Sequence, residues 1–278
     1  MSNIDKKSIL EAATRFLNDS PANFLDKDVA LRPDLAGSRF YDDPIIGCAD
    51  AGDPMFEGMR AMEAVGPMFT LPDQWLPGAV SVVSLFFPYT DRIVDANAAE
   101  PVEVPPEWLH GRYEGQMTIN TAMDHLKKLI EDAGYAVLIP SSDARFQSGR
   151  KDIPDQVAYT SSWSERHVAH ICGLGTFSLS RCLITKIGAA GRFGSLITTL
   201  PLEADPRPYT HYAQYCDLCG LCALKCPANA IDPSKGMNGK DMAACAAQTQ
   251  RTREKHDPRY GCGKCSAGVP CSRGIPGK

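Results

Sequence analysis

The sequence lacks the long apolar runs, the leader and the strong charge bias that several classes of protein require. No apolar stretch approaches the roughly 20 residues that a transmembrane helix needs. The opening MSNIDKKSILEAATRFLND has neither the apolar core of a secretory signal nor a twin-arginine start. Lys and Arg number 29 against 33 Asp and Glu, which leaves a formal net charge of -4 and no basic excess to attract polynucleotides. We therefore expect a cytoplasmic protein with no membrane partner, and rank polynucleotide substrates low.

Cysteine, by contrast, is abundant and clustered. Eleven cysteines occur in 278 residues, and eight of them fall between positions 216 and 271. Disulfides belong to oxidising compartments, so clustering without a secretory signal favours metal ligation in a reducing one. The three cysteines outside the cluster, Cys48, Cys172 and Cys182, are expected to be buried free thiols.

The stretch CDLCGLCALKCP at 216–227 carries the most specific pattern in the chain. Its spacing is C-x2-C-x2-C-x3-C followed by Pro, the run of bacterial-type ferredoxins, in which three cysteines ligate one [4Fe-4S] cluster and the fourth ligates a second. By the same exchange we assign two ligand sets: Cys216, Cys219, Cys222 and Cys271 for one cluster, and Cys226, Cys245, Cys262 and Cys265 for the other. A zinc ribbon also uses C-x2-C pairs, and a single cluster with loose thiols is the other alternative, since 262–271 is spaced C-x2-C-x5-C.

The rest of the chain mixes helical and extended patterns, and its length allows about two domains. Apolar periodicity predicts helices at 4–17, 119–135 and 161–175, and β-branched or apolar runs predict strands at 76–89, 136–142, 181–187 and 194–202. Loops and short helices are expected over 26–70, and a polar loop over 144–156. The acidic, Pro-rich segment 203–212 is the best boundary, dividing the chain into domains 1–205 and 206–278.

The order of these features resembles epoxyqueuosine reductase and, more remotely, the corrinoid-dependent reductive dehalogenases. The likeness covers roughly 70–271 and rests on LPGAVSVVSLFFPY, on ERHVAHICGLGTFSLSRCLIT with its Glu165–Arg166 pair, on GSLITTLPL and on the cysteine pattern. It implies an α/β (α+β) nitroreductase-like core followed by a ferredoxin-like module with two [4Fe-4S] clusters. It also implies a cobalamin that receives single electrons through the clusters and reduces a small organic substrate, with an external low-potential donor such as ferredoxin or flavodoxin.

Three departures separate this chain from the tRNA-modifying enzymes. Those enzymes continue into a helical-repeat region that helps grip tRNA, whereas this sequence stops at Lys278, so tRNA is disfavoured as a substrate. Their proton-donating aspartate corresponds here to Tyr159, and reductive dehalogenases employ a tyrosine in that role. The turn GLGTFSLS lacks the Gly-Lys-Asn of the tRNA enzymes.

Six residues outside the cysteine module are candidates for the site. Tyr159 is the candidate general acid, because nearby cations can lower a phenol's pKa, and Asp143, just after a strand, is the alternative. A tyrosine packed at a helix entry and a turn-forming Asp are the structural readings of the same residues. Gly173 and Gly175 would let the backbone approach a large cofactor, although helix termination also explains Gly173. Arg192 and Ser195 would contact a nucleotide tail.

Two other functions compete with a cobalamin reductase. One is an electron-transfer protein whose α/β part has lost its organic cofactor and serves for docking. The other is a reductase on the same core that binds flavin instead. The sequence therefore predicts a two-cluster iron-sulfur oxidoreductase and leaves its organic cofactor open.

Overall fold

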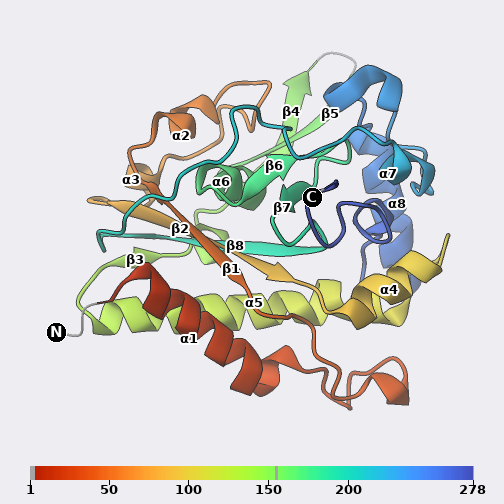
Figure 1. The fold of residues 1–278 in the computed structure, drawn as a ribbon, viewed down its shortest axis with the longest axis horizontal. Coiled ribbons are helices and arrows are strands. Elements are labelled where there is room, and N and C mark those ends of the chain that lie inside the picture. Colours follow the sequence, from red (N-terminus) through yellow and green to blue (C-terminus); the bar gives the residue numbers. More distant parts are fainter. Residues whose placement is uncertain (1–3, 154–155, 278) are drawn as a thin grey trace.

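A four-stranded antiparallel sheet organises the protein. The computed structural model describes residues 4–153 and 156–277 (Figure 1). The strands follow the order β1-β2-β8-β3, with β1 (Ile45–Asp50), β2 (Ser81–Pro88), β8 (Gly191–Thr198) and β3 (Val137–Leu138), and each neighbouring pair is antiparallel. Seven of the eight residues of β2 are buried, which fits a central strand covered on both faces. The prediction of a strand within 76–89 is confirmed.

Helices cover both faces of this sheet (Figure 1). On one face α1 (Lys6–Asp19) and α5 (Pro106–Asp132) pack against Val83, Leu85 and Phe87 of β2. On the other face lie α2 (Pro54–Gly58), α3 (Pro72–Trp75) and α6 (Glu165–Ile171), whose apolar side chains enclose Val82 and Ile197. The alternation of side chains along β2 therefore divides the apolar core between two layers.

The helix expected at 4–17 is confirmed as α1, which begins after an Asp5 N-cap that accepts from Ser8 N at 2.8 Å. The helix expected at 119–135 is longer, because α5 already begins at Pro106. Gly111 and Gly115 hid this first half from a periodicity search. They are needed there because a Cβ atom at Gly115 would lie 2.7 Å from Tyr41 Oη.

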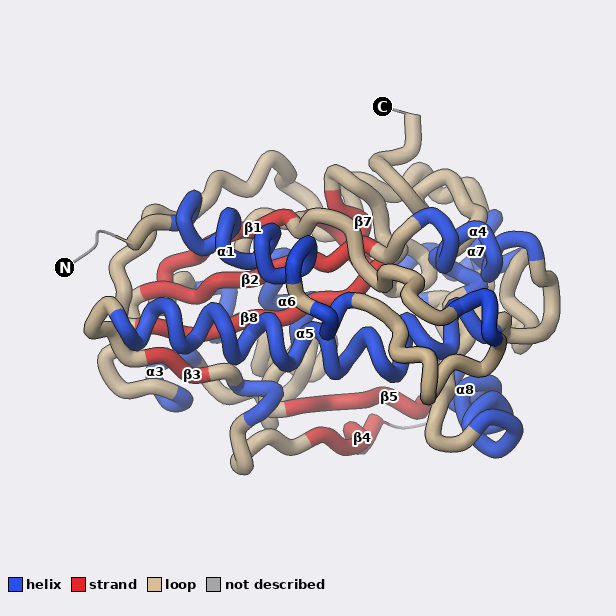
Figure 2. The backbone as a smooth tube through the Cα atoms, turned by 90° about the horizontal axis from the view of Figure 1, so that it is seen from below, coloured by secondary structure: helices blue, strands red, loops and turns tan. Residues whose placement is uncertain are grey.

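Two predicted irregular regions contain regular structure instead. The edge strand β1 lies in the segment 26–70, which was expected to hold loops and short helices. Strand β4 (Ser148–Ile153) lies in the polar loop expected over 144–156 and pairs with β5 (Gln156–Ser161) as an antiparallel hairpin. The sequence also did not predict α4 (Asp91–Ala99), which follows β2. The hairpin is held by backbone pairing and has no apolar stripe, so its polar sequence gave no signal for a strand. Figure 2 shows β5 running beside α8 (Met242–His256), so the hairpin reaches the cysteine-rich region.

The cysteine-rich region folds against one end of the sheet. A two-stranded sheet of β6 (Gly175–Phe177) and β7 (Leu183–Thr185) adjoins it, and α7 (Leu221–Leu224) lies within it. Backbone bonds tie the two parts together, with Ala189 N donating to Cys271 O at 2.9 Å and Tyr215 N donating to Thr176 Oγ1 at 2.8 Å. Short 3-10 turns complete the chain at Pro21–Asn23, Pro33–Leu35, Pro140–Ser142, Pro233–Asn238 and Lys264–Ser266. The division at residue 205 stays a prediction.

A buried lysine also fixes this region to α4. The Lys264 ammonium donates to the carbonyl oxygens of Asn97 (3.1 Å) and Glu100 (2.6 Å) and to Asn97 Oδ1 (2.8 Å), and Asn97 Nδ2 donates to Cys262 O at 3.0 Å. Carbonyls at a helix C-terminus lack intrahelical partners and carry partial negative charge, so they suit a cation.

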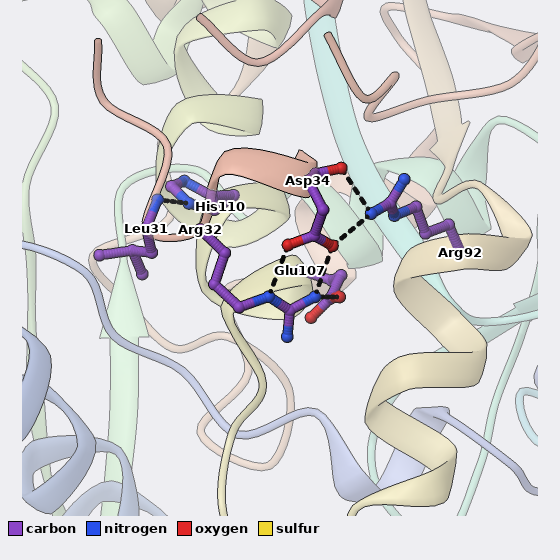
Figure 3. A network of polar contacts seen from close by, with 6 residues as sticks. All are labelled: Leu31, Arg32, Asp34, Arg92, Glu107 and His110. Atoms are coloured by element: carbon purple, nitrogen blue, oxygen red, sulfur yellow. Dashed lines mark hydrogen bonds and ion pairs between the residues drawn. The ribbon is translucent and has the colours of Figure 1, made fainter. Parts of the chain in front are cut away.

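An ionic network fastens the segment before β1 to α4 and α5 (Figure 3). The Arg32 guanidinium bonds both carboxylate oxygens of Asp34 at 3.0 Å and reaches Glu107 at 2.6 Å, while Arg92 donates to Asp34 at 3.0 Å. In the part of the chain that the structure describes, no helix is long and apolar enough to cross a membrane.

The packing of Gly263 yields a stability prediction. A Cβ atom there would lie 1.8 Å from the Trp108 ring, and its φ of +68° already disfavours other residues. Gly37 has a similar φ of +74° but open space around it. Gly37→Ala should therefore cost about 1 kcal/mol of unfolding free energy, and Gly263→Ala clearly more, about 3 kcal/mol, because steric overlap adds to backbone strain. Urea unfolding of both variants checks this, and equal losses would contradict the contact with Trp108.

Candidate iron-sulfur site and its surroundings

Four cysteines surround one hollow at the end of α7. Cys216, Cys219, Cys222 and Cys271 line a partly open hollow, together with apolar side chains of Leu179, Ile184 and Val269. The loop turns through left-handed conformations at Leu218 (φ 57°) and Gly220 (φ +76°), which brings the first three cysteines to the same side. Cys219 is exposed, so the hollow lies near the surface.

The chemistry of these thiols suits a soft metal. Burial raises the pKa of Cys222 to about 11 and that of Cys271 to about 12, and neighbouring cysteines add to both rises. Without a metal the two thiols therefore stay protonated at neutral pH, and a metal has to displace their protons to bind. Four sulfur donors around an apolar hollow fit an iron-sulfur cluster.

The second set of cysteines also converges. Burial raises the pKa of Cys262, and Cys226 and Cys245 add to the rise, which puts both of these thiols within electrostatic reach of Cys262. Cys265 lies near Cys262, and a hydrogen bond to Cys182 together with burial holds its pKa high. Lys264 lies between them in sequence and opposes the rise at Cys262.

Cys182 has neighbours that the sequence did not suggest. It was expected to be a buried free thiol, but it is half-buried, hydrogen-bonds Cys265 and packs against the same apolar cluster as Cys216 and Cys271. Cys48 and Cys172 are buried as expected. Among residues 4–153 and 156–277, no group of three His, Cys, Asp or Glu side chains is close enough to hold a single metal ion.

Three of the four residues predicted to contact an organic cofactor contact other protein atoms instead. A Cβ atom at Gly175 would lie 2.0 Å from Ile184 O, so pairing of β6 with β7 requires that glycine. A Cβ atom at Gly173 would lie 2.9 Å from Pro206 O, and its φ of +83° ends α6. Ser195 is fully buried and accepts from Trp163 Nε1 at 2.8 Å. Of the four, only Arg192 has a charged group that could bind a ligand. It is half-buried, and its Nε donates to Gln116 Oε1 at 2.9 Å.

The two predicted proton donors lie in different settings. Tyr159 is 40% exposed on β5, opposite Arg150 in the hairpin. Asp143 accepts from Arg145 Nε at 2.8 Å and from Arg145 Nη2 at 3.0 Å, and these bonds hold its pKa at about 2. The Asp143 carboxylate is thus ionised at neutral pH, carries no proton to donate, and is a poor general acid.

Glu165 is the acid that sequence reasoning missed as a site residue. Its buried carboxyl accepts from Ser195 Oγ at 2.6 Å and is also hydrogen-bonded by Ser141. Burial raises the pKa of Glu165 to about 7. From the sequence, Glu165 is only a residue in the first turn of a helix. Its carboxyl is buried because the fold brings it against β8, and no pattern around residue 165 predicts that contact.

Comparison with known proteins supports the motif and the fold. The family model described as a 4Fe-4S binding domain matches residues 209–232, the segment that holds Cys216, Cys219, Cys222 and Cys226. No curated protein matches the chain.

Among solved structures, the chain is similar to an epoxyqueuosine reductase from Bacillus subtilis at 18% identity and a TM-score of 0.50, covering 85% of this chain and 63% of that one. It is similar to an epoxyqueuosine reductase solved with a tRNA stem loop at 19% identity and a TM-score of 0.50, covering 84% and 63%. A catabolic reductive dehalogenase matches at 17% identity and a TM-score of 0.52, covering 84% of this chain and 30% of that one.

This chain thus spans less than two thirds of the length of those reductases. Identities this low establish a shared fold and leave the activity open. The expected resemblance to epoxyqueuosine reductases and reductive dehalogenases is confirmed as a likeness of fold, in a mixed α and β chain that carries a ferredoxin-type 4Fe-4S motif.

Proposed function

We propose that this protein is an iron-sulfur oxidoreductase that passes single electrons through two [4Fe-4S] clusters to an acceptor in its α/β part and reduces a small organic substrate. The observation that carries the proposal is the convergence of Cys271 with the first cysteine run around one hollow. Cys271 is remote in sequence from that run, so spacing within CDLCGLCALKCP does not account for its position.

In this proposal the two cysteine sets hold one cube each. Cys216, Cys219, Cys222 and Cys271 hold the cube near the surface, and Cys226, Cys245, Cys262 and Cys265 hold the other. The exposure of Cys219 favours the first cube as the entry point for electrons from an external low-potential donor such as ferredoxin or flavodoxin. We propose a cytoplasmic location and a substrate other than tRNA.

The acceptor that the resemblance implies is cobalamin on a nitroreductase-like core, with flavin as the alternative. Cobalamin, when bound, supplies a strongly reducing cobalt centre. Gly173, Gly175 and Ser195 do not fit as its contacts, because protein atoms already fill the space around the two glycines and Ser195 is buried in a hydrogen-bonded group. Any organic cofactor has to bind through other residues.

Three residues remain to be compared as the proton donor. Glu165 combines a buried carboxyl with a pKa of about 7, so it carries a proton in part of the molecules at neutral pH. Tyr159 stays a candidate on the exposed hairpin. Asp143 is the least suited because Arg145 keeps it ionised.

An electron-transfer protein without an organic cofactor is the second candidate function. The packing of Gly173, Gly175 and Ser195 against protein favours it, since these positions were predicted to face a cofactor. In that case the α/β part serves only for docking.

The cluster assignment predicts the iron content of two variants. Anaerobically reconstituted wild-type protein should hold about eight iron atoms per chain, and Cys271→Ser should lower this to about four because its cube loses one of four thiolates. Cys172→Ser, with a thiol that donates to Val82 O at 3.6 Å, is the matched control and should keep the wild-type content. Iron analysis with EPR of the reduced protein measures both. Unchanged iron in Cys271→Ser would remove that residue from the ligand set.

Cofactor binding separates the proposed reductase from the electron carrier. Anaerobic titration of the reconstituted protein with cob(II)alamin, followed by EPR, should show saturable binding near one equivalent if cobalamin is the acceptor. A fluorescent flavin released by acid from the purified protein would favour the flavin enzyme. If the protein holds both clusters but binds neither cobalamin nor flavin, the electron-transfer function is favoured.

The raised pKa of Glu165 predicts that the free energy of unfolding depends on pH. Its folded-state pKa of about 7 exceeds the ordinary value of 4.5, so its contribution to stability is complete below pH 4.5 and is lost as pH rises through 7. Glu165→Gln should abolish that loss, which amounts to on the order of 3 kcal/mol between pH 5 and pH 8. Urea unfolding at both pH values tests this, with the exposed Glu131→Gln as control. An identical pH dependence in wild type and Glu165→Gln would contradict a buried acid.

A further inference from the structure

Two half-buried arginines lie close together between the sheet and the cysteine module. Arg112 belongs to α5, and Arg192 opposes Phe87 in the ladder of β2 and β8. Both guanidinium groups are within electrostatic reach of the Tyr41 phenol. Arg112 also lies over the Tyr260 ring, with its Cζ atom 4.9 Å from the ring centre. The two cations therefore share one tyrosine-lined environment.

Neither arginine has an acidic partner. Among the residues that the structure describes, no ion pair includes Arg112 or Arg192, and the hydrogen bonds of Arg192 go to the Gln116 amide oxygen and the Tyr89 hydroxyl. The nearby Glu114 is already committed to His110 and Arg259.

Glu165 is within electrostatic reach of Arg192, but its carboxyl already accepts from Ser195, and burial favours its protonated, uncharged form. Half-buried cations without a counter-charge are unusual, because removing a charge from water is costly unless it is paired.

Repulsion between cations adds to this cost at Arg112, whereas at Arg192 burial is outweighed by the Tyr89 and Tyr41 phenols, which raise its pKa. Burial, and then the charge of Arg192, lowers the pKa of Arg112, and Arg166 contributes a further positive charge. The phenol groups of Tyr89 and Tyr260 only partly offset these effects. An anion placed between the two guanidinium groups would relieve both the desolvation cost and the repulsion.

We propose that Arg112 and Arg192 form a binding site for an oxyanion, a carboxylate or a phosphate group, at the junction of the sheet and the cysteine module. Guanidinium groups bind both kinds of group through paired hydrogen bonds. The site adjoins the second cysteine set, since Tyr260 precedes Cys262 by two residues and a Cβ atom at Gly261 would lie 3.2 Å from Arg112 Cγ. A ligand anchored here is thus held beside the proposed second cube.

The oxyanion can come from two sources. It is either the acidic group of a small substrate or the phosphodiester of a nucleotide-bearing cofactor. The site follows from the uncompensated arginines and does not depend on which acceptor the protein uses, so it goes beyond the proposed function.

Binding of simple anions tests the site directly. The probes are inorganic phosphate and benzoate, added to reconstituted protein at low ionic strength and followed by calorimetry and thermal unfolding. We expect saturable binding that Arg112→Gln and Arg192→Gln each weaken about tenfold or more. Arg15→Gln, which changes an exposed arginine of α1, is the matched control and should bind like wild type. Without anions, Arg112→Gln should unfold at the same or a higher temperature, because it removes repulsion.

A second arm identifies the source of the anion. Cobalamin carries a nucleotide phosphodiester and cobinamide does not. If the variants weaken cobalamin binding but not cobinamide binding, the site holds a cofactor phosphate. If they weaken only phosphate and benzoate binding, the site holds a substrate acid.

The proposal is overturned if none of these ligands binds with an affinity that depends on Arg112 or Arg192. Should a variant fail to fold, phenylglyoxal labelling of the wild-type protein decides instead. Phosphate or benzoate should then protect Arg112 and Arg192 from modification several-fold, while the labelling of Arg15 stays unchanged. Equal labelling with and without anion would reject the site.

Discussion

The buried ammonium of Lys264 is the contact on which the placement of the cysteine module depends. It lies between Cys262 and Cys265 and bonds the carbonyl groups at the end of α4, while Lys225, next to Cys226, donates to Ala98 O of the same helix end at 3.2 Å. Two lysines beside proposed cluster ligands thus use one helix C-terminus, where partial negative charge compensates their burial. The position of the second cysteine set is fixed relative to α5 and the sheet by this contact and by the packing of Gly263 on Trp108.

The two kinds of buried cation in this protein have opposite consequences. Lys264 is fully partnered by backbone and amide oxygens, so it stabilises the fold. Arg112 and Arg192 have no acidic partner in any ion pair of the described residues, and both lie within electrostatic reach of the Tyr41 phenol. The contacts of Lys264 hold the structure together, whereas Arg112 and Arg192 can still gain a favourable interaction from a bound anion. That difference distinguishes a structural cation from a candidate binding residue better than burial does.

Sequence reasoning succeeded where short-range patterns decide the structure. Cysteine spacing identified the 4Fe-4S motif, and the continuous apolar run identified β2, because both signals are local. It failed for β1 and for the β4–β5 hairpin, whose polar or Gly-containing strands are set by backbone pairing. It also named Asp143 and not Glu165 as a proton donor, since nothing in the sequence shows that Arg145 keeps one carboxyl ionised or that β8 buries the other.

The exposure of the first cysteine set would favour electron exchange but would also leave a cluster open to dioxygen. Cys219 is open to solvent, and Leu218 and Leu224 nearby are 57% and 82% exposed. A cube held there would exchange electrons readily with a docked donor, because little protein separates it from the surface. The same short path admits dioxygen, which destroys such clusters, so the working lifetime of the protein in air would be set by this one loop and not by the stability of its fold.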